Sequence, residues 1–540
     1  MSTLRKVMAI VVFVGLVLAG CGPKATPTAE PVEVEVTRIV AGTPETVVVT
    51  ATPKPVVESD KVAIWSPCGA ETVADWNYDP ILQAVEQATN TDIEIVNVDW
   101  GAFVDQVNAG AASGEVPDII GIIGPDQRGT LEQWAADGVI APFEGEVAEA
   151  APNVLAEYET NSALAEVKVD GKIYFQPVGW GDGYYPNMGL FHVRKDLLDK
   201  YGMQPPDTFD QYFEYLRTCQ ENGDGTGAVF GGSGGVGPAI NAFVGAYGAP
   251  MRGWVKMGDG YEYWAIQPGV KQGLLLFRKM VAEGLVDPGV WEMDGDQTRA
   301  AYVSGSACSL IFNGGGHTGR IQNDMALVNE SFQEWMLPAL DAGAGSRGYT
   351  SEEMFWGTSQ LGGMEGNNPV AAARVINYLI SEEGYKLTTV GVEGRDHEVV
   401  NGEIVMLPQR TKDGFPTEAG DTGAHPLAAC IVSWQPQEWQ NWALLYGKDQ
   451  AYKDWFDQMW ENQGQYQIQT YGLLTASPKW NGFQATSNDL INLAFLEIVQ
   501  AASDEEASAR FDQFAQDWLN SGGADAQAEM SDVLTQLYSQ

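Results

Sequence analysis

The sequence predicts an α/β protein with mostly parallel sheets and helices on both faces. Short strands alternate with amphipathic helices after residue 60, and the strands are apolar nearly throughout rather than at every second position. Hydrophobic residues make up 44% of the 540 positions, which is enough for a large buried core. At this length we expect two to four domains.

The first strands and helices follow each other without a break. The pattern predicts, in order, a strand Lys61–Trp65, a helix opened by Asp79 and Pro80, a strand Ile93–Val98, a helix from about Ala102 to Ala112 and a strand Asp118–Ile123. Ligands of parallel sheets bind beyond the carboxyl ends of the strands. The segments just after Trp65 and Ile123 are therefore expected to be binding loops.

Two later helices carry clear start signals. Thr208 and Gln211 form a capping-box pattern ahead of an amphipathic stretch, and Asn368 with Pro369 opens another. Both signals are structural and predict no chemistry.

The charge balance limits the partners. The chain has 30 Lys and Arg against 72 Asp and Glu, a formal net charge of −42. Such a surface would repel nucleic-acid phosphates and anionic lipid head groups, so we expect no nucleic-acid partner. Four histidines leave little material for a histidine-rich metal site, and no metal site is predicted.

The N-terminus has the order of a bacterial lipoprotein signal peptide, residues 1–20. Arg5 and Lys6 precede an apolar run that ends in Leu18-Ala19-Gly20-Cys21. The run is short for a membrane span, although a short transmembrane anchor is the alternative. We expect cleavage before Cys21, lipidation of its thiol, and an extracytoplasmic protein anchored to the cell membrane by that lipid.

Residues 21–59 read as a tether. They are rich in Pro, Thr, Val, Ala and Glu and lack aromatic residues, which predicts an extended, semi-stiff spacer. The alternative is that the valine-rich pieces pair as a small hairpin.

Several separated segments resemble the family 1 extracellular solute-binding proteins of ABC importers, the maltose-binding-protein-like group. The segments that carry the resemblance are Asp118–Ile120 with the following LEQWAADGVIAPFEGEV, Asp170–Pro177, Phe191–Leu198 with Pro205-Pro-Asp-Thr-Phe-Asp, Tyr302–Ala307 with Leu310-Ile-Phe, and Ser381–Tyr385. The resemblance implies a two-lobed periplasmic-binding-protein-like fold (type II) with a hinge between discontinuous lobes. The expected ranges are 60–180 and 340–405 for lobe 1, and 181–339 and 406–540 for lobe 2.

A narrower likeness is to the lipoproteins of this family that take up oligosaccharides. It rests on Val281–Pro288, Gly391–Gly394 and Asn401-Gly402. It implies a monomeric binding protein, not an enzyme, that captures a carbohydrate by closure of its lobes and delivers it to ABC permease subunits.

One family feature is altered here. Relatives often have a calcium loop of the DxNxNG type after the capping-box helix, and the matching run is Gln220–Thr226. Gln220 replaces the first aspartate ligand, and Gly231 stands where a bidentate Glu is needed. A plain glycine-rich loop is expected, with retained calcium binding as the alternative and no cofactor predicted.

A sugar site needs aromatic faces for stacking and planar polar groups for hydroxyls. The chain has 17 Trp and 20 Tyr, and those in loop-like contexts are more informative than those on helical faces. For each candidate, packing or a solvated loop position is the competing interpretation. The expected ligand contacts are Trp65, Asp126, Trp180, Asp182, Tyr184, Tyr185, Asn313, Trp356, Glu393 and Trp434.

Four cysteines remain after Cys21, namely Cys68, Cys219, Cys308 and Cys430. An exported protein can oxidise them, and four cysteines allow three pairings. The sequence does not choose between these pairings and free buried thiols.

Two rival functions stay open. A tethered glycoside hydrolase would share the export signal and the aromatic content, and it would need two carboxylates at a fixed separation. A peptide or other solute could also be the ligand of the same fold.

Overall fold

The computed structural model describes residues 33–40, 43–50, 58–67, 76–124, 127–160, 164, 167–179, 188–231, 236–314, 316–350, 355–407, 425–429, 431–432, 442, 445–473 and 475–538. The chain divides into two compact units, Met1–Ser59 and Asp60–Gln540. Within the described ranges, none of the helices combines the length and apolar character that crossing a membrane requires.

The first unit holds a β-hairpin, so the expectation of a fully extended tether is wrong for residues 33–50. Strands β1 (Glu33–Val40) and β2 (Thr43–Thr50) pair antiparallel with Val36 opposite Val47. Valine and threonine favour strands, and only two residues separate the two segments. This is the hairpin alternative that the sequence left open.

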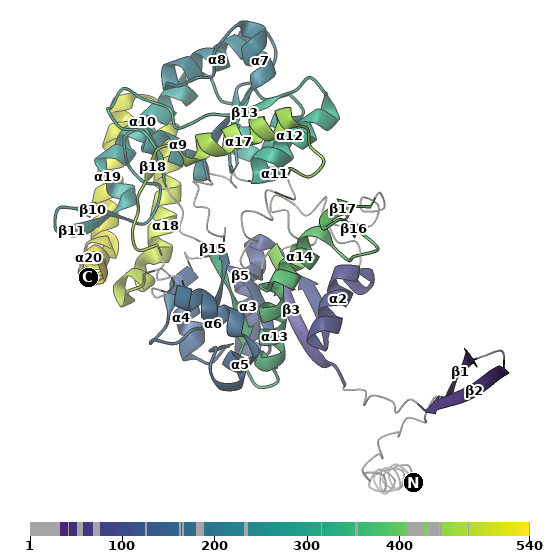
Figure 1. Cartoon of the computed structure of the whole chain (residues 1–540). Helices are drawn as coiled ribbons and strands as arrows, with labels where there is room; N and C mark the ends of the chain where they lie inside the picture. Colours follow the sequence, from purple (N-terminus) through teal and green to yellow (C-terminus); the bar gives the residue numbers. More distant parts are fainter. Residues whose placement is uncertain are drawn as a thin grey trace, which may run out of the picture. The chain divides into compact units, whose positions relative to one another are not determined.

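The second unit has two separate hydrophobic cores, one in each lobe (Figure 1). The first lobe contains β3 (Asp60–Ser66), α2 (Pro80–Thr89), β4 (Thr91–Asn97), α3 (Phe103–Ser113), β5 (Ile119–Ile123), α4 (Arg128–Ala136), β6 (Ile140–Ala141), α5 (Gly145–Ala150), α6 (Pro152–Thr160), β7 (Phe175–Gly179), β15 (Phe355–Gly362), α13 (Pro369–Leu379), α14 (Glu382–Val390) and α15 (Pro426–Ala429). A hairpin of β16 (His397–Val400) and β17 (Glu403–Met406) follows α14.

The second lobe is larger. It contains β8 (Leu190–Arg194), α7 (Lys195–Tyr201), α8 (Phe209–Glu221), β9 (Ala228–Phe230), α9 (Ile240–Gly245), β10 (Trp254–Met257), β11 (Gly260–Tyr263), α10 (Pro268–Ala282), α11 (Gly295–Val303), β12 (Ser309–Phe312), α12 (Gly316–Val328), β13 (Glu334–Met336), β14 (Tyr349–Thr350), α17 (Gln450–Gly464), β18 (Gln467–Ile468), α18 (Pro478–Val499), α19 (Asp504–Trp518) and α20 (Ala524–Tyr538).

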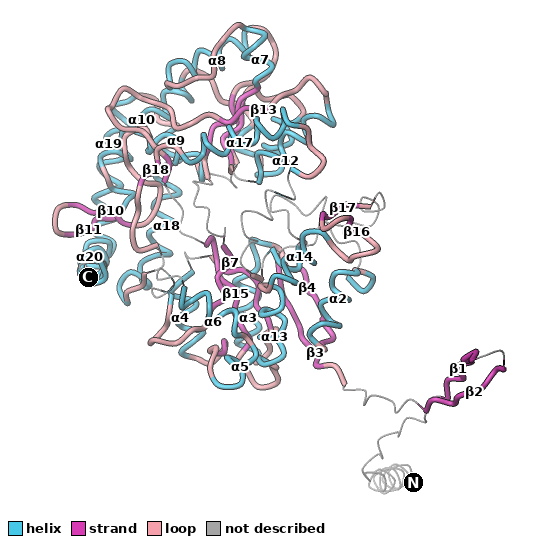
Figure 2. Tube along the Cα trace, viewed as in Figure 1, coloured by secondary structure: helices cyan, strands magenta, loops and turns pink. Residues whose placement is uncertain are grey.

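The sheet of the first lobe is mixed. Its order is β4-β3-β5-β15-β6, with β7 beside β15 (Figure 2). Strands β3, β4 and β5 are parallel, as predicted, but β15 is antiparallel to β5, β6 and β7. The expectation of a mostly parallel sheet is therefore wrong. Strand β15 re-enters this sheet from the second lobe at the edge where β5 ends, so it runs in the opposite direction.

The sheet of the second lobe has the order β13-β8-β12-β9. Only β12 and β9 are parallel, whereas β8 is antiparallel to both β12 and β13. Helices pack against this sheet, and their apolar faces form the larger core. This sheet too is mixed rather than mostly parallel.

Local signals in the sequence placed the predicted elements correctly. Asp79 caps α2 by accepting a hydrogen bond from the backbone N–H of Leu82. Thr208 and Gln211 form the complete capping box of α8, and Asn368 caps α13. These contacts join residues three positions apart, so a local pattern is enough to predict them.

Two stretches pack in a different lobe from the one that the predicted ranges gave them. Leu340 and Tyr349 are buried in the core of the second lobe, and β14 pairs with β18. Leu427 and Val432 are buried in the core of the first lobe. The chain therefore returns to the second lobe only after residue 432, about 26 residues later than predicted.

A buried polar contact fixes this late return. His425 Nε2 lies 3.1 Å from Asp79 Oδ2, and the backbone N–H of His425 donates to the carbonyl of Thr388 at 2.8 Å. His425 Nδ1 accepts from the Leu427 N–H, so Nε2 carries the proton and donates to Asp79. Burial alone would raise the pKa of Asp79, but the hydrogen bonds from His425 and from backbone N–H groups outweigh it and lower that pKa.

Replacing Asp79 with alanine removes both the cap of α2 and the partner of His425. We expect the free energy of unfolding at pH 7 to fall by about 2–4 kcal/mol, measured by urea denaturation. Asp449→Ala is the matched control, because Asp449 caps α17 from an exposed position. Its loss should cost about 1 kcal/mol.

The difference in the free energy of unfolding between wild type and Asp79→Ala should depend on pH. A carboxyl whose pKa is lowered by folding stabilises the protein above the unfolded pKa and loses that contribution as the pH falls through the folded pKa. The gap between wild type and Asp79→Ala should therefore shrink below about pH 4. A gap of constant size from pH 7 to pH 3 would show that Asp79 acts only as a neutral cap.

Candidate functional site

Four strand ends meet at one edge of the first sheet. Strands β3 and β5 end there, and in the antiparallel pairs Phe355 at the start of β15 lies opposite Gly179 at the end of β7, while Thr358 lies opposite Ile123. The chain therefore leaves the first lobe after β7 and re-enters it at β15 along the same edge. This edge matches the place where the sequence predicted the binding loops.

Most predicted contacts follow these strand ends in the sequence. Asp126, Trp180, Asp182, Tyr184, Tyr185 and Trp434 lie outside the described residues, and Trp356 is described only as a backbone position in β15. Their roles stay predictions. Cys68 and Cys430 also lie outside the described residues.

Trp65 has a packing role. Its side chain is half-buried and packs against the core of the first lobe. A Cβ placed on Gly110 of α3 would lie 3.3 Å from Cη2 of the Trp65 ring, so the glycine makes room for the indole. The packing interpretation therefore accounts for part of the Trp65 surface, and only the remainder is available to a ligand.

The second sheet presents a similar edge. Leu190 at the start of β8 lies opposite Phe312 at the end of β12, and the half-buried Asn313 follows directly. The carbonyl of Asn313 lies 3.0 Å from His192 Nε2. Asn313 is thus held at a strand end that lies beside the start of β8, the first strand after the chain crosses from the first sheet.

His192 belongs to a fully buried pair. Its Nδ1 lies 2.7 Å from Glu334 Oε1, and both side chains have no exposed surface. The Asn313 carbonyl can only accept, so Nε2 must carry a proton, and the bond to Glu334 then holds one further proton between the two side chains. Burial raises the pKa of Glu334, although the hydrogen bond and charge of His192 offset part of this rise.

Glu393 is exposed in the turn between α14 and the β16–β17 hairpin. The turn is shaped by the buried Asp396, whose Oδ2 accepts from the Val392 N–H at 2.8 Å and whose Oδ1 pairs with Arg395 at 2.7 Å. Glu393 is therefore accessible to a ligand.

A groove, which we call the junction groove, lies where the two lobes meet. It is lined by α3 and α4 of the first lobe and by α18, whose Trp480 and Phe483 belong to the second core. Its volume is about 700 Å³. Six of its lining side chains are amides, namely Asn108, Gln127, Gln133, Asn481, Gln484 and Asn488.

Close contacts hold this junction together. Asn481 Nδ2 donates to Glu132 Oε2 at 2.8 Å, and the other oxygen of Glu132 accepts from Arg128 Nε at 3.0 Å. A Cβ on Gly129 would lie 3.1 Å from Cβ of Asn481, so the glycine lets α4 approach α18. The groove is thus bounded by elements of both lobes.

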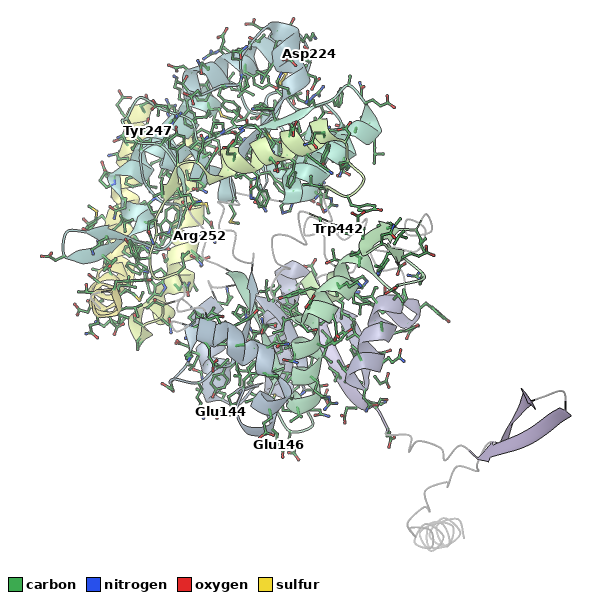
Figure 3. All side chains as sticks on the ribbon, in the orientation of Figure 1. Glu144, Glu146, Asp224, Tyr247, Arg252 and Trp442 are labelled. Atoms are coloured by element: carbon green, nitrogen blue, oxygen red, sulfur yellow. A yellow bond between two sulfur atoms is a disulfide. The ribbon has the colours of Figure 1, made fainter. Side chains whose placement is uncertain are left out.

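Sequence reasoning missed the groove and the His192–Glu334 pair. Their residues are far apart in the chain, such as Gln127 and Gln484, so no local pattern joins them. One signal was present, because His192 is a polar residue in the middle of a strand in which Leu190, Phe191 and Val193 are apolar. Trp442 (labelled in Figure 3) packs against Tyr446 in a tilted arrangement with ring centroids 4.9 Å apart, and this contact was also not predicted.

Two curated relatives come from Bacillus subtilis (strain 168). The lipoprotein LipO is 23% identical over 371 residues, which is 62% of this chain and 67% of that protein. The polygalacturonan/rhamnogalacturonan-binding protein YtcQ is 22% identical over 249 residues, 44% of this chain and 47% of that protein. The chain thus spans about half to two thirds of these relatives.

Solved structures share the fold over nearly the whole body. The alginate-binding protein AlgQ2, in a crystal structure without calcium ion, matches with a TM-score of 0.70 at 18% identity over 91% of this chain and 99% of that one. The substrate-binding protein FusA of S. pneumoniae, in complex with kestose, matches with a TM-score of 0.67 at 18% identity, covering 89% and 99% of the two chains. These matches confirm the two-lobed type II fold with a hinge between the lobes.

A family model described as bacterial extracellular solute-binding protein matches residues 73–386. That range covers more than half of the chain and takes in strands of both sheets, including β5, β7 and β15 of the edge described above. The chain therefore belongs to the bacterial extracellular solute-binding protein family.

Proposed function

We propose that this protein is a membrane-tethered receptor that captures an oligosaccharide outside the cytoplasm and delivers it, unaltered, to an ABC permease. The names of its relatives support a carbohydrate ligand. YtcQ is named for binding polygalacturonan and rhamnogalacturonan, AlgQ2 for binding alginate, and FusA was solved with kestose.

The junction groove is the observation that carries this proposal. An amide side chain has two N–H donors and a carbonyl acceptor, so it can pair with hydroxyls that act in either direction. Six amides around one groove of about 700 Å³ suit a ligand rich in hydroxyl groups. Ligand pockets in proteins have volumes of roughly 300–1,000 Å³.

Closure of the lobes is the proposed mechanism. The two sheet edges belong to different lobes, and so do the two sides of the junction groove. Polar groups from both lobes could therefore contact one ligand. A ligand that contacts both lobes binds the closed state better than the open one and shifts the population toward closure. The permease would then recognise the closed state.

The remaining predicted contacts complete the proposed site. Aromatic rings at the three crossings would stack on the apolar faces of the sugar, and carboxylates and amides would accept or donate to its hydroxyls. The proposed contacts are Trp65, Asp126, Trp180, Asp182, Tyr184, Tyr185, Asn313, Trp356, Glu393 and Trp434, together with the amides of the junction groove.

A hydrolase of glycosides is less well supported. It needs two carboxyl groups at a defined separation across the scissile bond. Among the described residues that line the junction groove, Asp489 alone is acidic. Capture without cleavage fits this lining better.

The test of function is a thermal-shift screen of the unit from Ser59 onward against oligosaccharides, amino acids and peptides. A ligand at 100 times its dissociation constant stabilises the folded state by about 2.7 kcal/mol. We expect one class of oligosaccharide to raise the melting temperature, with mass spectrometry recovering it intact. Cleavage products would replace the proposal with the hydrolase, and a shift with peptides alone would replace the sugar with a peptide.

Truncation of a proposed stacking residue should weaken binding without unfolding the protein. Trp356→Ala is expected to weaken oligosaccharide affinity by about 10- to 100-fold, since a buried aromatic contact contributes about 1.5–3 kcal/mol. The matched control is Tyr538→Ala, which removes an aromatic ring from the C-terminal helix α20. Titration calorimetry should show equal affinity for wild type and the control, and a Trp356→Ala protein of wild-type affinity would remove Trp356 from the site.

The anchor is proposed to be a lipid on Cys21. Cys21→Ser removes the thiol that the lipid would occupy, so we expect the protein to lose labelling by a fatty-acid probe in cells. The control is Cys430→Ser, which removes another cysteine and leaves Cys21 in place. Labelling that persists in Cys21→Ser would place the lipid at another residue.

A further inference from the structure

The family resemblance implies a calcium site in the loop after α8. The residues of this loop show whether a calcium ion fits there. Calcium in such loops takes oxygens from positions 1, 3, 5, 7, 9 and 12, with a bidentate Glu at the last position. Counting from Gln220, these positions fall on Gln220, Asn222, Asp224, Thr226, Ala228 and Gly231. The structure describes all six residues.

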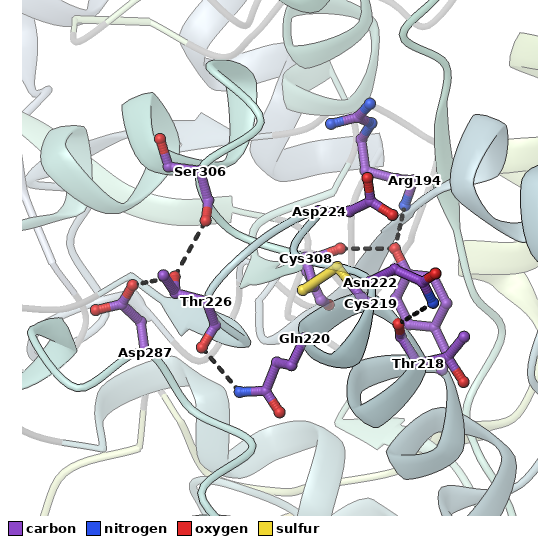
Figure 4. Close-up of a disulfide and its surroundings, with 12 residues drawn as sticks. Arg194, Thr218, Cys219, Gln220, Asn222, Asp224, Thr226, Asp287, Ser306 and Cys308 are labelled. Atoms are coloured by element: carbon purple, nitrogen blue, oxygen red, sulfur yellow. Dashed lines mark hydrogen bonds between the residues drawn. A yellow bond between two sulfur atoms is a disulfide. The ribbon is translucent and has the colours of Figure 1, made fainter.

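At the first position, the side-chain amide N–H of Gln220 points into the loop as a hydrogen-bond donor, whereas calcium needs an oxygen ligand there. Gln220 Nε2 donates to the carbonyl of Thr226 at 3.0 Å (Figure 4). It also donates to the carbonyl of Gly284 at 2.9 Å. The Thr226 carbonyl is the backbone ligand expected at position seven, and here it accepts a hydrogen bond from the Gln220 amide instead. Asn222 Nδ2 likewise turns back and donates to the carbonyl of Thr218 at 2.8 Å.

The fifth position is neutralised by a lysine. Both oxygens of Asp224 accept from Lys200 Nζ, at 2.7 and 2.6 Å, and Oδ2 also accepts from the Tyr201 hydroxyl at 2.5 Å. The hydrogen bonds from Lys200 and Tyr201 lower the pKa of Asp224. Asp224 lies beside α7 and α8 (Figure 3), and α7 supplies the ammonium group.

The twelfth position has no room for a ligand. A Cβ on Gly231 would lie 2.5 Å from Cδ2 of Phe312, whose ring fills the space where a glutamate side chain would begin. Within the described part of the chain, no three His, Cys, Asp or Glu side chains form a group that could hold a metal. The residues of this loop therefore do not fit calcium.

A disulfide closes the loop from the other side. Cys219 at the end of α8 is bonded to Cys308 ahead of β12, with Cα atoms 6.2 Å apart, which settles one pairing that the sequence left open. A Cβ on Gly225 would lie 2.9 Å from the Cys308 sulfur, so the loop packs directly on this bond. Thr226 adds a hydrogen bond from its hydroxyl to Asp287.

We infer that Lys200, the Gln220 amide and the Cys219–Cys308 disulfide do together what a calcium ion does in relatives, so that the second lobe needs an oxidising environment and no divalent cation. The ammonium group supplies the positive charge for Asp224. The disulfide ties the start of the loop to the residue before β12, and the Gln220 amide joins that start to the carbonyls of Thr226 and Gly284. Stability of the second lobe is thereby tied to export rather than to the calcium concentration.

The cation arm of the test uses the purified full chain in three states: untreated, after EDTA, and with 1 mM calcium chloride. We expect the same melting temperature in all three and no saturable terbium luminescence. A calcium-dependent rise in melting temperature that EDTA reverses would overturn the inference.

The disulfide arm uses the paired variant Cys219→Ser/Cys308→Ser. Because the bond closes a long stretch of chain, its loss should lower the melting temperature by about 5–10 °C. Cys68→Ser/Cys430→Ser is the matched control and reports any effect of the other cysteines. If the paired variant melted like wild type, the disulfide would have no structural role in the loop.

The lysine arm reads the loop itself by hydrogen exchange. Lys200→Gln should speed exchange in the peptide that covers residues 219–231 by about three- to fivefold, the size expected of a partly exposed ion pair. Lys195→Gln is the control, since Lys195 is on the same helix but pairs with Asp199 outside the loop. Equal exchange in the two variants would remove Lys200 from the account.

Discussion

Strand β15 is the constraint on which the rest of the structure depends. It lies inside the first sheet and is antiparallel to β5, β6 and β7, so it joins segments that are far apart in the chain. Its start is level with the end of β7, and Ser359 in its middle donates to the carbonyl of Ile431. The strand therefore fixes where the chain leaves the first lobe, where it comes back, and where it leaves for the last time.

This arrangement explains why segments that are far apart in the sequence start or end at one edge of the first sheet. Each crossing must leave the edge of a sheet, and parallel strands end at that same edge. In the second sheet, the start of β8 and the end of β12 lie side by side in the same way, with Asn313 tied to the buried His192 and Glu334. Under the proposed function, these two edges and the amides contributed by α4 and α18 would give a ligand contacts from both lobes.

The sequence predicted what depends on neighbouring residues. The cap of α2 by Asp79 and the capping box of α8 join residues three apart, and the strand Lys61–Trp65 contains the continuous apolar run Val62–Trp65. The direction of β15 could not be predicted in this way, because the sequence of one strand does not show whether its partner runs parallel or antiparallel to it. Nor could the return of residues 425–432 to the first lobe, since His425 meets an aspartate 346 positions away. The amides of the junction groove were missed for the same reason, because they come from three helices in two lobes.

The central claim is that a ligand binds between the lobes and draws them together. Small-angle X-ray scattering of the unit from Ser59 onward, with and without a saturating oligosaccharide, tests it most directly, because closure reduces the radius of gyration while binding to one lobe leaves it unchanged. We predict that the ligand reduces the radius of gyration of the wild-type protein. For Trp356→Ala we predict no change when the sugar concentration is below the dissociation constant of that variant. Saturation of the wild-type protein without any change in radius would contradict the account.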